Sequence, residues 1–334
     1  MKIVIPGGSG QVGQMLARHY LAGGHEVVIL SRSRSHLPVT EKLRTVLWDA
    51  NSLGDWQTEV DGADVVVNLA GKSVNCRYHA TNRRSVIDSR VNSTRAIGRA
   101  IQQAEVPPRV WLQASTATIY AHRYDAPNDD LTGIIGGEEP RAPDTWRFSI
   151  DVAKSWEHAA SEFQLPQTRQ VLLRSAMTMS PDRGGVFDVL LGLVRKGLGG
   201  ASDDGRQFVS WIHEVDFVRA LDWLIEHEEL SGPVNLASPE PLPNAEFMRT
   251  LRQAWGTSIG LPASRWMLEI GALFLRTETE LILKSRRVVP TRLLDSGFTF
   301  RYIDWAAAAR ELVARWRAVR KLGHSALTSE MVSC

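Results

Sequence analysis

The sequence predicts an α/β fold with a doubly wound parallel sheet and a smaller, mainly helical C-terminal lobe. In the N-terminal half, short β-branched runs alternate with helical patterns, which is typical of parallel strands joined by right-handed crossovers. The strand-like runs are continuously apolar, as expected of parallel strands buried on both faces. After Met179 the alternation gives way to glycine-rich and proline-containing segments and further helical patterns, which indicates a second lobe.

The elements of the main sheet are expected in a regular order. The predicted strands cover residues 2–6, 26–30, 45–48, 64–70, 109–115 and 169–175. The predicted helices cover residues 11–22, 82–104 and 148–157, the last being the stretch FSIDVAKSWE.

The region beyond Met179 is divided between the two lobes. Residues 208–212 read as a strand, a helix begins near Glu214, and the piece ending at residues 234–238 returns in part to the main sheet. A last helix from about Asp304 carries an apolar stripe expected to pack on the core, formed by Trp305, Ala309, Leu312, Trp316 and Val319. We therefore expect a main domain of residues 1–180 and 211–238 and a C-terminal lobe of residues 181–210 and 239–334.

Charge and cysteine content limit the function classes. The 334 residues include 39 Lys+Arg and 37 Asp+Glu, and this balance predicts no nucleic-acid partner and no attraction to an anionic membrane. The two cysteines, Cys76 and Cys334, predict no disulfide framework and no zinc site, and favour a reducing, cytoplasmic location. The start KIVIP lacks a signal-peptide pattern, and no apolar run approaches the roughly 20 residues that span a bilayer.

The strongest local signal is the glycine-rich loop PGGSGQVG, between the first predicted strand and helix. Gly8, Gly10 and Gly13 match G-x-G-x-x-G, and Gly7 with Gly10 and Gly13 matches a wider-spaced variant. Glycines here allow a tight turn, close approach of a pyrophosphate and packing of helix on strand, and the helix N-terminus attracts phosphate. We predict a Rossmann-like dinucleotide site, with cofactor contacts from Gly7, Gly8, Ser9, Gly10, Gln11, Val12 and Gly13.

The end of the second strand indicates which dinucleotide binds. NAD enzymes usually carry an acidic residue there, whereas this chain has Ser31 and Arg32, which suit a 2′-phosphate. The main domain is thus predicted to bind NADP(H). Asp49 could accept a hydrogen bond from the adenine amino group or act as a helix cap, and both readings stay open. Small residues are expected beside the middle of the cofactor, namely Leu69, Ala70 and Gly71.

Ordered signatures along nearly the whole chain carry a family resemblance. They are PGGSGQVG, LSR, WD, NLAG, RY followed by DSR, KSWE, LRS, WIHEVD, NLASPEPLPNAEF and VVPTRLLDSGFTFRY. In these features the chain resembles the extended short-chain dehydrogenases/reductases, and most closely their atypical, YfcH-like epimerase group. The resemblance implies a nicotinamide cofactor, usually NADP(H), an unidentified small-molecule substrate, and a possible homodimer through the helices at 82–104 and 148–157.

The catalytic helix departs from the pattern that the resemblance implies. Extended members carry Tyr-x-x-x-Lys followed four residues later by Glu. If Glu157 is that Glu, Ser149 and Ala153 stand at the tyrosine and lysine positions. Using Lys154 instead puts Ile150 at the tyrosine position, so neither register restores the pair.

The resemblance also points to candidates for catalysis. Thr116 falls at the catalytic Ser/Thr position and is expected to bond a substrate oxygen, although it could instead satisfy backbone groups. Ser149 is a second candidate, but a serine has too high a pKa to replace the tyrosine unaided. Tyr120 carries a phenol near the same crevice, and the resemblance gives it no proton-transfer role.

Further positions are expected near the cofactor or between the lobes. Arg77 and Tyr78 match an Arg-aromatic pair of the group and could contact the cofactor or an anionic substrate. The backbone at Met177 is expected to run alongside the nicotinamide ring of the cofactor. Arg90 replaces the usual asparagine of the long helix. His213, in WIHEVD, suits proton transfer by its pKa range, but the favoured interpretation is a histidine fixed by hydrogen bonds between the lobes.

These observations lead to two functional hypotheses. The first is an NADP(H)-dependent oxidoreductase or epimerase-like enzyme that binds a small molecule between the main domain and the C-terminal substrate lobe. The alternative is a catalytically inactive protein that senses NADPH and passes its occupancy to a partner.

Overall fold

The computed structural model describes residues 1–33, 40–140, 142–264, 266–267 and 279–331, and the side chains of all of these except 281 and 322–331. Its centre is a seven-stranded parallel sheet in the order β10-β6-β5-β4-β1-β2-β3. The strands are β1 (Lys2–Pro6), β2 (Glu26–Ser31), β3 (Leu43–Leu47), β4 (Val65–Asn68), β5 (Val110–Thr116), β6 (Arg169–Ser175) and β10 (Gly232–Leu236).

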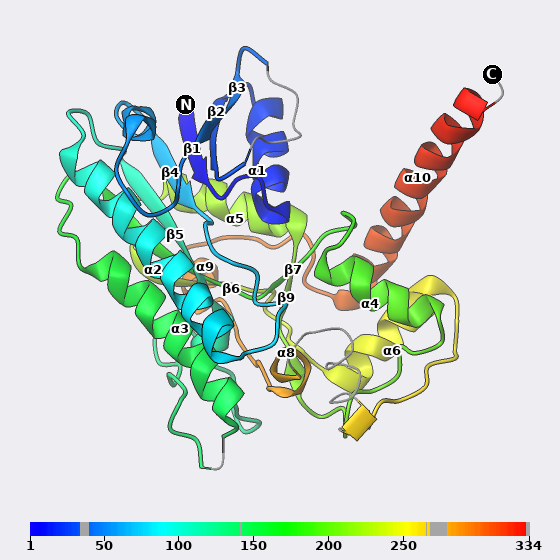
Figure 1. The fold of residues 1–334 in the computed structure, drawn as a ribbon. Helices are drawn as coiled ribbons and strands as arrows, with labels where there is room; N and C mark the ends of the chain where they lie inside the picture. Colours follow the sequence, from blue (N-terminus) through cyan, green and yellow to red (C-terminus); the bar gives the residue numbers. More distant parts are fainter. Residues whose placement is uncertain (34–39, 141, 265, 268–278, 332–334) are drawn as a thin grey trace.

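Helices cover both faces of this sheet (Figure 1). Successive side chains of a strand point to opposite faces, so Ile3 and Ile5 pack with helices α1 and α5, whereas Val4 packs with α2 and α3. The helices are α1 (Gln11–Ala22), α2 (Ala80–Gln103), α3 (Asp144–Ser161) and α5 (Glu214–Glu226). This arrangement confirms the predicted doubly wound α/β fold.

The topology fixes where a ligand can bind. β1 lies between β2 and β4, so the crossovers from the centre of the sheet run outward in both directions. In open α/β sheets the ligand crevice lies outside the carboxyl ends of the strands at this switch point. The loops after β1, β2, β4 and β5 therefore meet at one edge.

A second core lies in the C-terminal region. Its helices pack around Phe247 and Trp305, whose rings stack at 4.1 Å between centroids. As predicted, Trp316 of the last helix is buried, but Val319 is 60% exposed, so the apolar stripe ends one turn early. The helices of this core are α4 (Val186–Arg195), α6 (Asn244–Trp255) and α10 (Trp305–Met331). The same region contains α8 (Glu280–Leu283) and α9 (Thr291–Asp295), and Leu293 of α9 packs in the core of the main sheet.

The strand predicted at residues 208–212 differs from the observed structure. It is split into β8 (Phe208–Val209), which pairs with β11 (Leu242–Pro243), and β9 (Trp211–His213), which pairs with β7 (Met177–Met179). At the break, the Ser210 hydroxyl donates to the carbonyl of Arg286 at 2.6 Å and accepts the Val288 N–H at 2.9 Å. The C-terminal segment therefore supplies the hydrogen-bond partners of Ser210 at this break. Of the described strands that follow Met179, β10 alone pairs with the main sheet.

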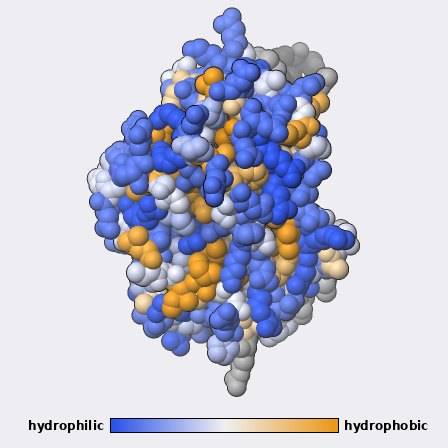
Figure 2. Space-filling view, turned by 90° about the vertical axis from the view of Figure 1, so that its left-hand side faces the viewer, coloured by the Kyte–Doolittle hydropathy of each residue, from blue (hydrophilic) through white to orange (hydrophobic). Residues whose placement is uncertain are grey.

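The face that carries α2 and α3 is the one expected to form a homodimer. Figure 2 shows this side of the molecule, with hydrophobic residues in separate patches among mainly hydrophilic ones. Two short 3₁₀ helices occur among the described residues, η1 (Asp55–Glu59) and η2 (Ala117–Ile119). The homodimer stays a prediction.

Candidate functional site

The glycine loop has the close backbone packing that the motif predicts. Gly7 adopts φ +77°, and a Cβ there would lie 2.8 Å from the backbone of Ala70 after β4. A Cβ on Gly13 would lie 2.4 Å from the Cα of Gly8, so α1 packs directly on the loop. Gly10 differs, because its Cβ position meets only the Gly7 carbonyl oxygen at 3.4 Å. This glycine therefore keeps space open on the ligand side of the loop.

A cavity of about 630 Å³ lies over this loop at the carboxyl ends of the strands. The N-terminus of α1 borders the cavity, and no side chain caps it, so its amide groups and dipole suit an anion. Nine of the predicted cofactor residues line the cavity, namely Gly7, Ser9, Gly10, Ser31, Arg32, Asp49, Leu69, Ala70 and Gly71. Gln11 and Val12 lie in the first turn of α1, next to these residues.

The end of β2 combines a fixed hydroxyl with an exposed cation. Ser31 is 3% exposed, and its hydroxyl donates to the Ser9 hydroxyl at 3.0 Å, which ties β2 to the glycine loop. Arg32 is exposed and lines the cavity. The guanidinium of Arg32, more than the Ser31 hydroxyl, is therefore placed to meet an anionic ligand.

Asp49 caps a turn and lines the cavity, and its contact with an adenine amino group stays a prediction. Its carboxylate accepts the backbone N–H groups of Asn51 and Ser52 at 2.8 and 2.9 Å. The hydroxyl of Ser52 donates to it at 2.6 Å, and these bonds hold the pKa of Asp49 below its usual value. The carboxylate is thus ionised, caps this turn and at the same time lines the cavity.

A second cavity, of about 220 Å³, lies beyond the carboxyl end of β5 and is lined by residues from the middle of α3 and from α2. Its polar groups include the side chains of Thr116, Ser149 and Glu280, and its walls are largely aromatic and aliphatic. The Thr116 Oγ1 accepts the Thr118 N–H at 3.2 Å, so this side chain both satisfies the backbone and faces the cavity. The remaining walls are formed by Val74, Tyr78, Val86, Arg90, Ser115, Thr118, Phe148, Val152 and Trp156.

Arg90 lies between the residues that line the two cavities. Its side chain would be 3.3 Å from a Cβ on Gly71, which lines the larger cavity, and it also lines the smaller one. Nη1 donates to the carbonyl oxygens of Lys72 and Val86, and the guanidinium lies over Trp156. Burial lowers the pKa of Arg90 to about 10, so it remains charged at neutral pH.

The orientation of α3 shows which of its residues face the small cavity. Ser149 lines the cavity, and Ala153, one turn later, is fully buried in a small core with Tyr120. Lys154 is exposed and Ile150 is buried outside the cavity lining. The register with Ser149 and Ala153 is therefore the one that points inward.

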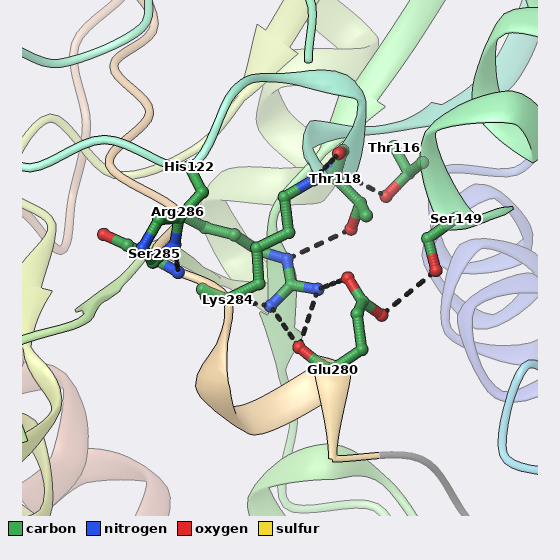
Figure 3. A network of polar contacts seen from close by, with 8 residues as sticks. All are labelled: Thr116, Thr118, His122, Ser149, Glu280, Lys284, Ser285 and Arg286. Carbon is green, nitrogen blue, oxygen red and sulfur yellow. Dashed lines mark hydrogen bonds and ion pairs between the residues drawn. The ribbon is translucent and has the colours of Figure 1, made fainter. Parts of the chain in front are cut away.

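The C-terminal segment supplies groups that the sequence did not predict. Figure 3 shows Glu280 and Arg286 meeting Ser149 and Thr118. The Ser149 hydroxyl donates to Glu280 Oε2 at 3.1 Å, and Arg286 Nη2 donates to Glu280 Oε1 at 2.6 Å. Arg286 Nε also donates to the Thr118 hydroxyl at 3.1 Å. These residues lie just before the VVPTRLL signature, and no local motif indicated them.

Lys284 anchors the same segment beneath η2. Nζ donates to the carbonyl oxygen of Thr118 at 2.7 Å, and the side chain is 1% exposed. Burial lowers the pKa of Lys284 to about 8, and the nearby Arg286 acts in the same direction. The Ser285 N–H next to it donates to His122 Nδ1 at 2.8 Å. The segment is thus fixed to the loop that follows β5.

Tyr120 lies outside the residues that line the small cavity. It is 2% exposed, its hydroxyl donates to Asn235 Oδ1 at 2.9 Å and accepts from Arg174 at 3.0 Å. Burial raises the pKa of Tyr120. Arg174 in turn forms a bidentate pair with Glu157 at 2.8 Å. The geometry therefore gives Tyr120 a place in a network that joins β6, β10 and α3.

Three other predicted residues lie apart from the cavity linings. His213 is fully buried at the start of α5, where Nδ1 accepts the Val215 N–H at 3.1 Å and Nε2 contacts Glu311 of α10 at 2.9 Å. Met177 packs at the edge of the C-terminal core. The carbonyl oxygen of Arg77 accepts from Asn82 at 2.8 Å. His213 thus has the fixed position between the lobes that was one of its two readings.

The described parts of the chain contain neither a metal-binding cluster nor a membrane-spanning helix. Among these residues, no group of three or more His, Cys, Asp or Glu side chains could hold a metal ion. No helix within the same ranges is both long and apolar enough to cross a membrane. Cys76 carries a free thiol, and Cys334 lies outside the described residues.

Comparisons with known proteins agree with this arrangement. A family model described as the NAD dependent epimerase/dehydratase family matches residues 3–143, and one described as a domain of unknown function (DUF1731) matches residues 263–312. The chain is 30% identical over 319 residues to the epimerase family protein SDR39U1 of Homo sapiens, with 94% of this chain and 100% of that protein covered. It is 29% identical over 321 residues to the epimerase family protein YfhF of Bacillus subtilis, with coverage of 96% and 100%.

A solved structure extends the comparison to three dimensions. The chain is similar to the crystal structure of the human epimerase family protein SDR39U1 (isoform 2) with NADPH, with a TM-score of 0.79 and 29% identity. The match covers 93% of this chain and 99% of that chain. With the glycine loop, the doubly wound sheet and similarity along nearly the whole length, the chain belongs to the NAD-dependent epimerase/dehydratase family.

Proposed function

We propose that the chain is an NADP(H)-dependent oxidoreductase or epimerase-like enzyme that acts on a small molecule in the 220 Å³ cavity. The observation that carries the proposal is the pair of neighbouring cavities with Arg90 between them. A long cofactor in the larger cavity would reach the second one at Thr116 and Ser149. The C-terminal segment, in which the domain of unknown function was matched, closes that second cavity through Glu280.

The residues of the larger cavity fit NADPH. The glycine loop and the uncapped N-terminus of α1 suit the pyrophosphate. Arg32 suits the 2′-phosphate, and Asp49 offers an acceptor for the adenine amino group. The human relative, crystallised with NADPH, supports this choice. When bound, the reduced nicotinamide would supply a hydride for a carbonyl carbon.

The residues of the smaller cavity would orient the substrate and exclude water from it. Thr116 offers a hydroxyl to a substrate oxygen, and Ser149 offers a second one from α3. Phe148 and Trp156 present apolar surface, while the charged Arg90 can hold an electron-rich substrate group. We propose that the chain works in this setting without a Tyr-x-x-x-Lys pair, because α3 contains no tyrosine.

A binding and turnover experiment tests this function. Calorimetry with NADPH and NADH should show tighter binding of NADPH. NADPH oxidation is then followed with the probe carbonyl compounds diacetyl, cyclohexanone and benzaldehyde, and with nucleotide sugars. NADPH binding without turnover of any probe counts heavily against an enzyme, and no binding of either coenzyme rejects the whole assignment.

The inward position of Ala153 favours a second candidate, an NADPH-sensing protein without catalysis. In this case, binding of NADPH would be passed to a partner through the C-terminal lobe. This sensor hypothesis predicts that Thr116→Ala preserves the biological role of the protein, whereas Arg32→Glu abolishes it. Equal loss in genetic complementation with both variants would remove the main support for a sensor.

A further inference from the structure

The source of the reaction's proton is a question that rests on the proposed function. Ser149 takes the position of the tyrosine, but a serine hydroxyl is too weak an acid to act alone. Among the described residues that line the small cavity, Glu280 is the one carboxylate. Glu280 comes from α8 and lies 131 positions after Ser149 in the sequence, and Figure 3 shows the two side chains facing each other.

Glu280 is held in a geometry that suits proton exchange. Oε2 accepts the hydroxyl of Ser149 at 3.1 Å, and Oε1 accepts Arg286 Nη2 at 2.6 Å. The Glu280 side chain is fully buried, so its charge is balanced by Arg286 and not by water. One carboxylate oxygen therefore contacts a hydroxyl of the cavity while the other is fixed by a cation.

Other titratable groups nearby are less suited to this role. Tyr78 lines the cavity, but burial raises the pKa of Tyr78 to about 12, so the phenol is not ionised at neutral pH and cannot accept the proton of an alcohol. Lys284 interacts electrostatically with Glu280, yet its ammonium group donates to the carbonyl of Thr118 and does not line the cavity. Among the described residues, Arg286 pairs with the carboxylate, and Arg90 is a further charged group that lines the same cavity.

We propose that Glu280 is the acid–base residue of this enzyme and that the Ser149 hydroxyl conducts the proton between Glu280 and the substrate oxygen. When an alcohol is oxidised, the substrate hydroxyl proton passes to Ser149 Oγ while the Ser149 proton passes to Glu280 Oε2. The hydride leaves the substrate carbon with both bonding electrons and is taken up by NADP⁺, which leaves a carbonyl, NADPH and protonated Glu280. Carbonyl reduction follows the same steps in reverse, and between turnovers Glu280 gains or loses its proton through the Ser149 hydroxyl, which lines the cavity.

The chain offers a matched carboxylate as a control. Glu157 also pairs with an arginine, Arg174, and accepts a serine hydroxyl, that of Ser115, at 2.6 Å. Unlike Glu280, it does not line the small cavity; it is also bonded to its arginine through both oxygens and is 13% exposed. Glu280→Gln and Glu157→Gln therefore both weaken a buried ion pair, but only the first removes a carboxylate from the cavity.

The first measurement is turnover of NADPH with diacetyl, cyclohexanone and benzaldehyde as probes. Glu280→Gln should lower kcat about 100-fold or more, change KM much less, and remove one limb of the pH profile of kcat. Glu157→Gln should keep the kcat and the profile of the wild type, although both variants lower Tm. A Glu280→Gln variant with wild-type kcat, or an equal loss of kcat in both variants, overturns the proposal.

A second measurement needs no turnover and separates this proposal from the proposed function. The fluorescence of bound NADPH is followed while the pH is varied. The wild type and Glu157→Gln should show a titration step that Glu280→Gln lacks. If NADPH binds but the wild type turns over no probe, the proposed function fails, and identical titration curves for all three proteins separately reject the role of Glu280.

Discussion

The Ser149 hydroxyl donates to Glu280 Oε2 at 3.1 Å, although the two residues are 131 positions apart in the sequence. The bond joins α3, which packs on the main sheet, to the C-terminal segment. Arg286 and Lys284 strengthen the same junction through the hydroxyl and carbonyl oxygens of Thr118. The wall of the small cavity and the junction of the C-terminal segment with α3 and η2 therefore share one polar network.

The free energy of unfolding should reveal this coupling. Ser149→Ala removes a hydrogen bond to a charged group and should lower it by about 1.5–3 kcal/mol. Glu280→Ala leaves Arg286 without its carboxylate and should lower it by about 3–5 kcal/mol. Urea unfolding of the double variant should show a loss smaller than the sum, by roughly 1–2 kcal/mol. Strictly additive losses would mean that the bond contributes nothing in solution.

Two glycines of the same loop should respond differently to alanine. Gly13→Ala places a Cβ within 2.4 Å of the Gly8 Cα, so the loop and α1 must separate, and stability should fall by about 1–3 kcal/mol. Gly10→Ala meets only a carbonyl oxygen at 3.4 Å and should fold normally. Its Cβ occupies ligand space, so NADPH affinity should fall about ten-fold or more. Thermal unfolding and calorimetry on both variants check this contrast, which a normal affinity for Gly10→Ala would contradict.

Selectivity for the phosphorylated coenzyme should depend on Arg32. Arg32→Glu replaces the exposed cation beside the cavity with a carboxylate, and the lost charged hydrogen bonds correspond to about 1.5–3 kcal/mol. Calorimetry should show NADPH affinity reduced by roughly 10- to 100-fold, with NADH affinity nearly unchanged. Arg32→Gln, which keeps hydrogen bonding without the charge, should be intermediate. Equal losses for both coenzymes would place Arg32 away from the 2′-phosphate.

The sequence predicted those parts of the site that depend on local geometry. The glycine loop is a single strand-turn-helix unit, so its spacing alone predicted close packing of the helix, which the structure has at Gly13 against Gly8. Ser31 was expected to contact the cofactor, and it lines the cavity, but its hydroxyl also donates to the Ser9 hydroxyl of the loop. The two serines are 22 positions apart, so the sequence pattern does not show that their side chains meet.

Glu280 could not be predicted in the same way. Its position depends on the C-terminal chain crossing back to η2, where Lys284 and Arg286 bind Thr118. These contacts are long-range and involve charged side chains with no characteristic spacing, so they resembled ordinary surface charges in the sequence. The split of the strand at Ser210 has the same origin, because the crossing segment supplies its hydrogen-bond partners.

The pH dependence of stability should report on His213, which links α5 to α10. Burial is the main cause that lowers the pKa of His213 to about 4, with Arg315 and Arg301 acting in the same direction and Glu214 and Asp216 opposing them.

Since an unfolded histidine titrates near 6.5, the unfolded chain binds a proton below this pH that the folded chain does not. The contribution of His213 to the free energy of unfolding is therefore complete above about pH 6.5 and is lost as the pH is lowered toward about 4. Between pH 7 and pH 5 the wild type should lose roughly 2 kcal/mol through this residue.

His213→Asn tests this contribution, because asparagine can still cap the Val215 N–H of α5. At pH 8 the variant should be less stable than the wild type, since it loses the stacking on Tyr302 at 3.9 Å and the contact with Glu311. Its stability should nevertheless change less between pH 7 and pH 5, as measured by urea unfolding at each pH. His158→Asn, at an exposed position of α3, serves as the control. If His213→Asn retained the full pH dependence, protonation of other groups would account for it, and the junction of α5 with α10 would not be sensitive to acid through this histidine.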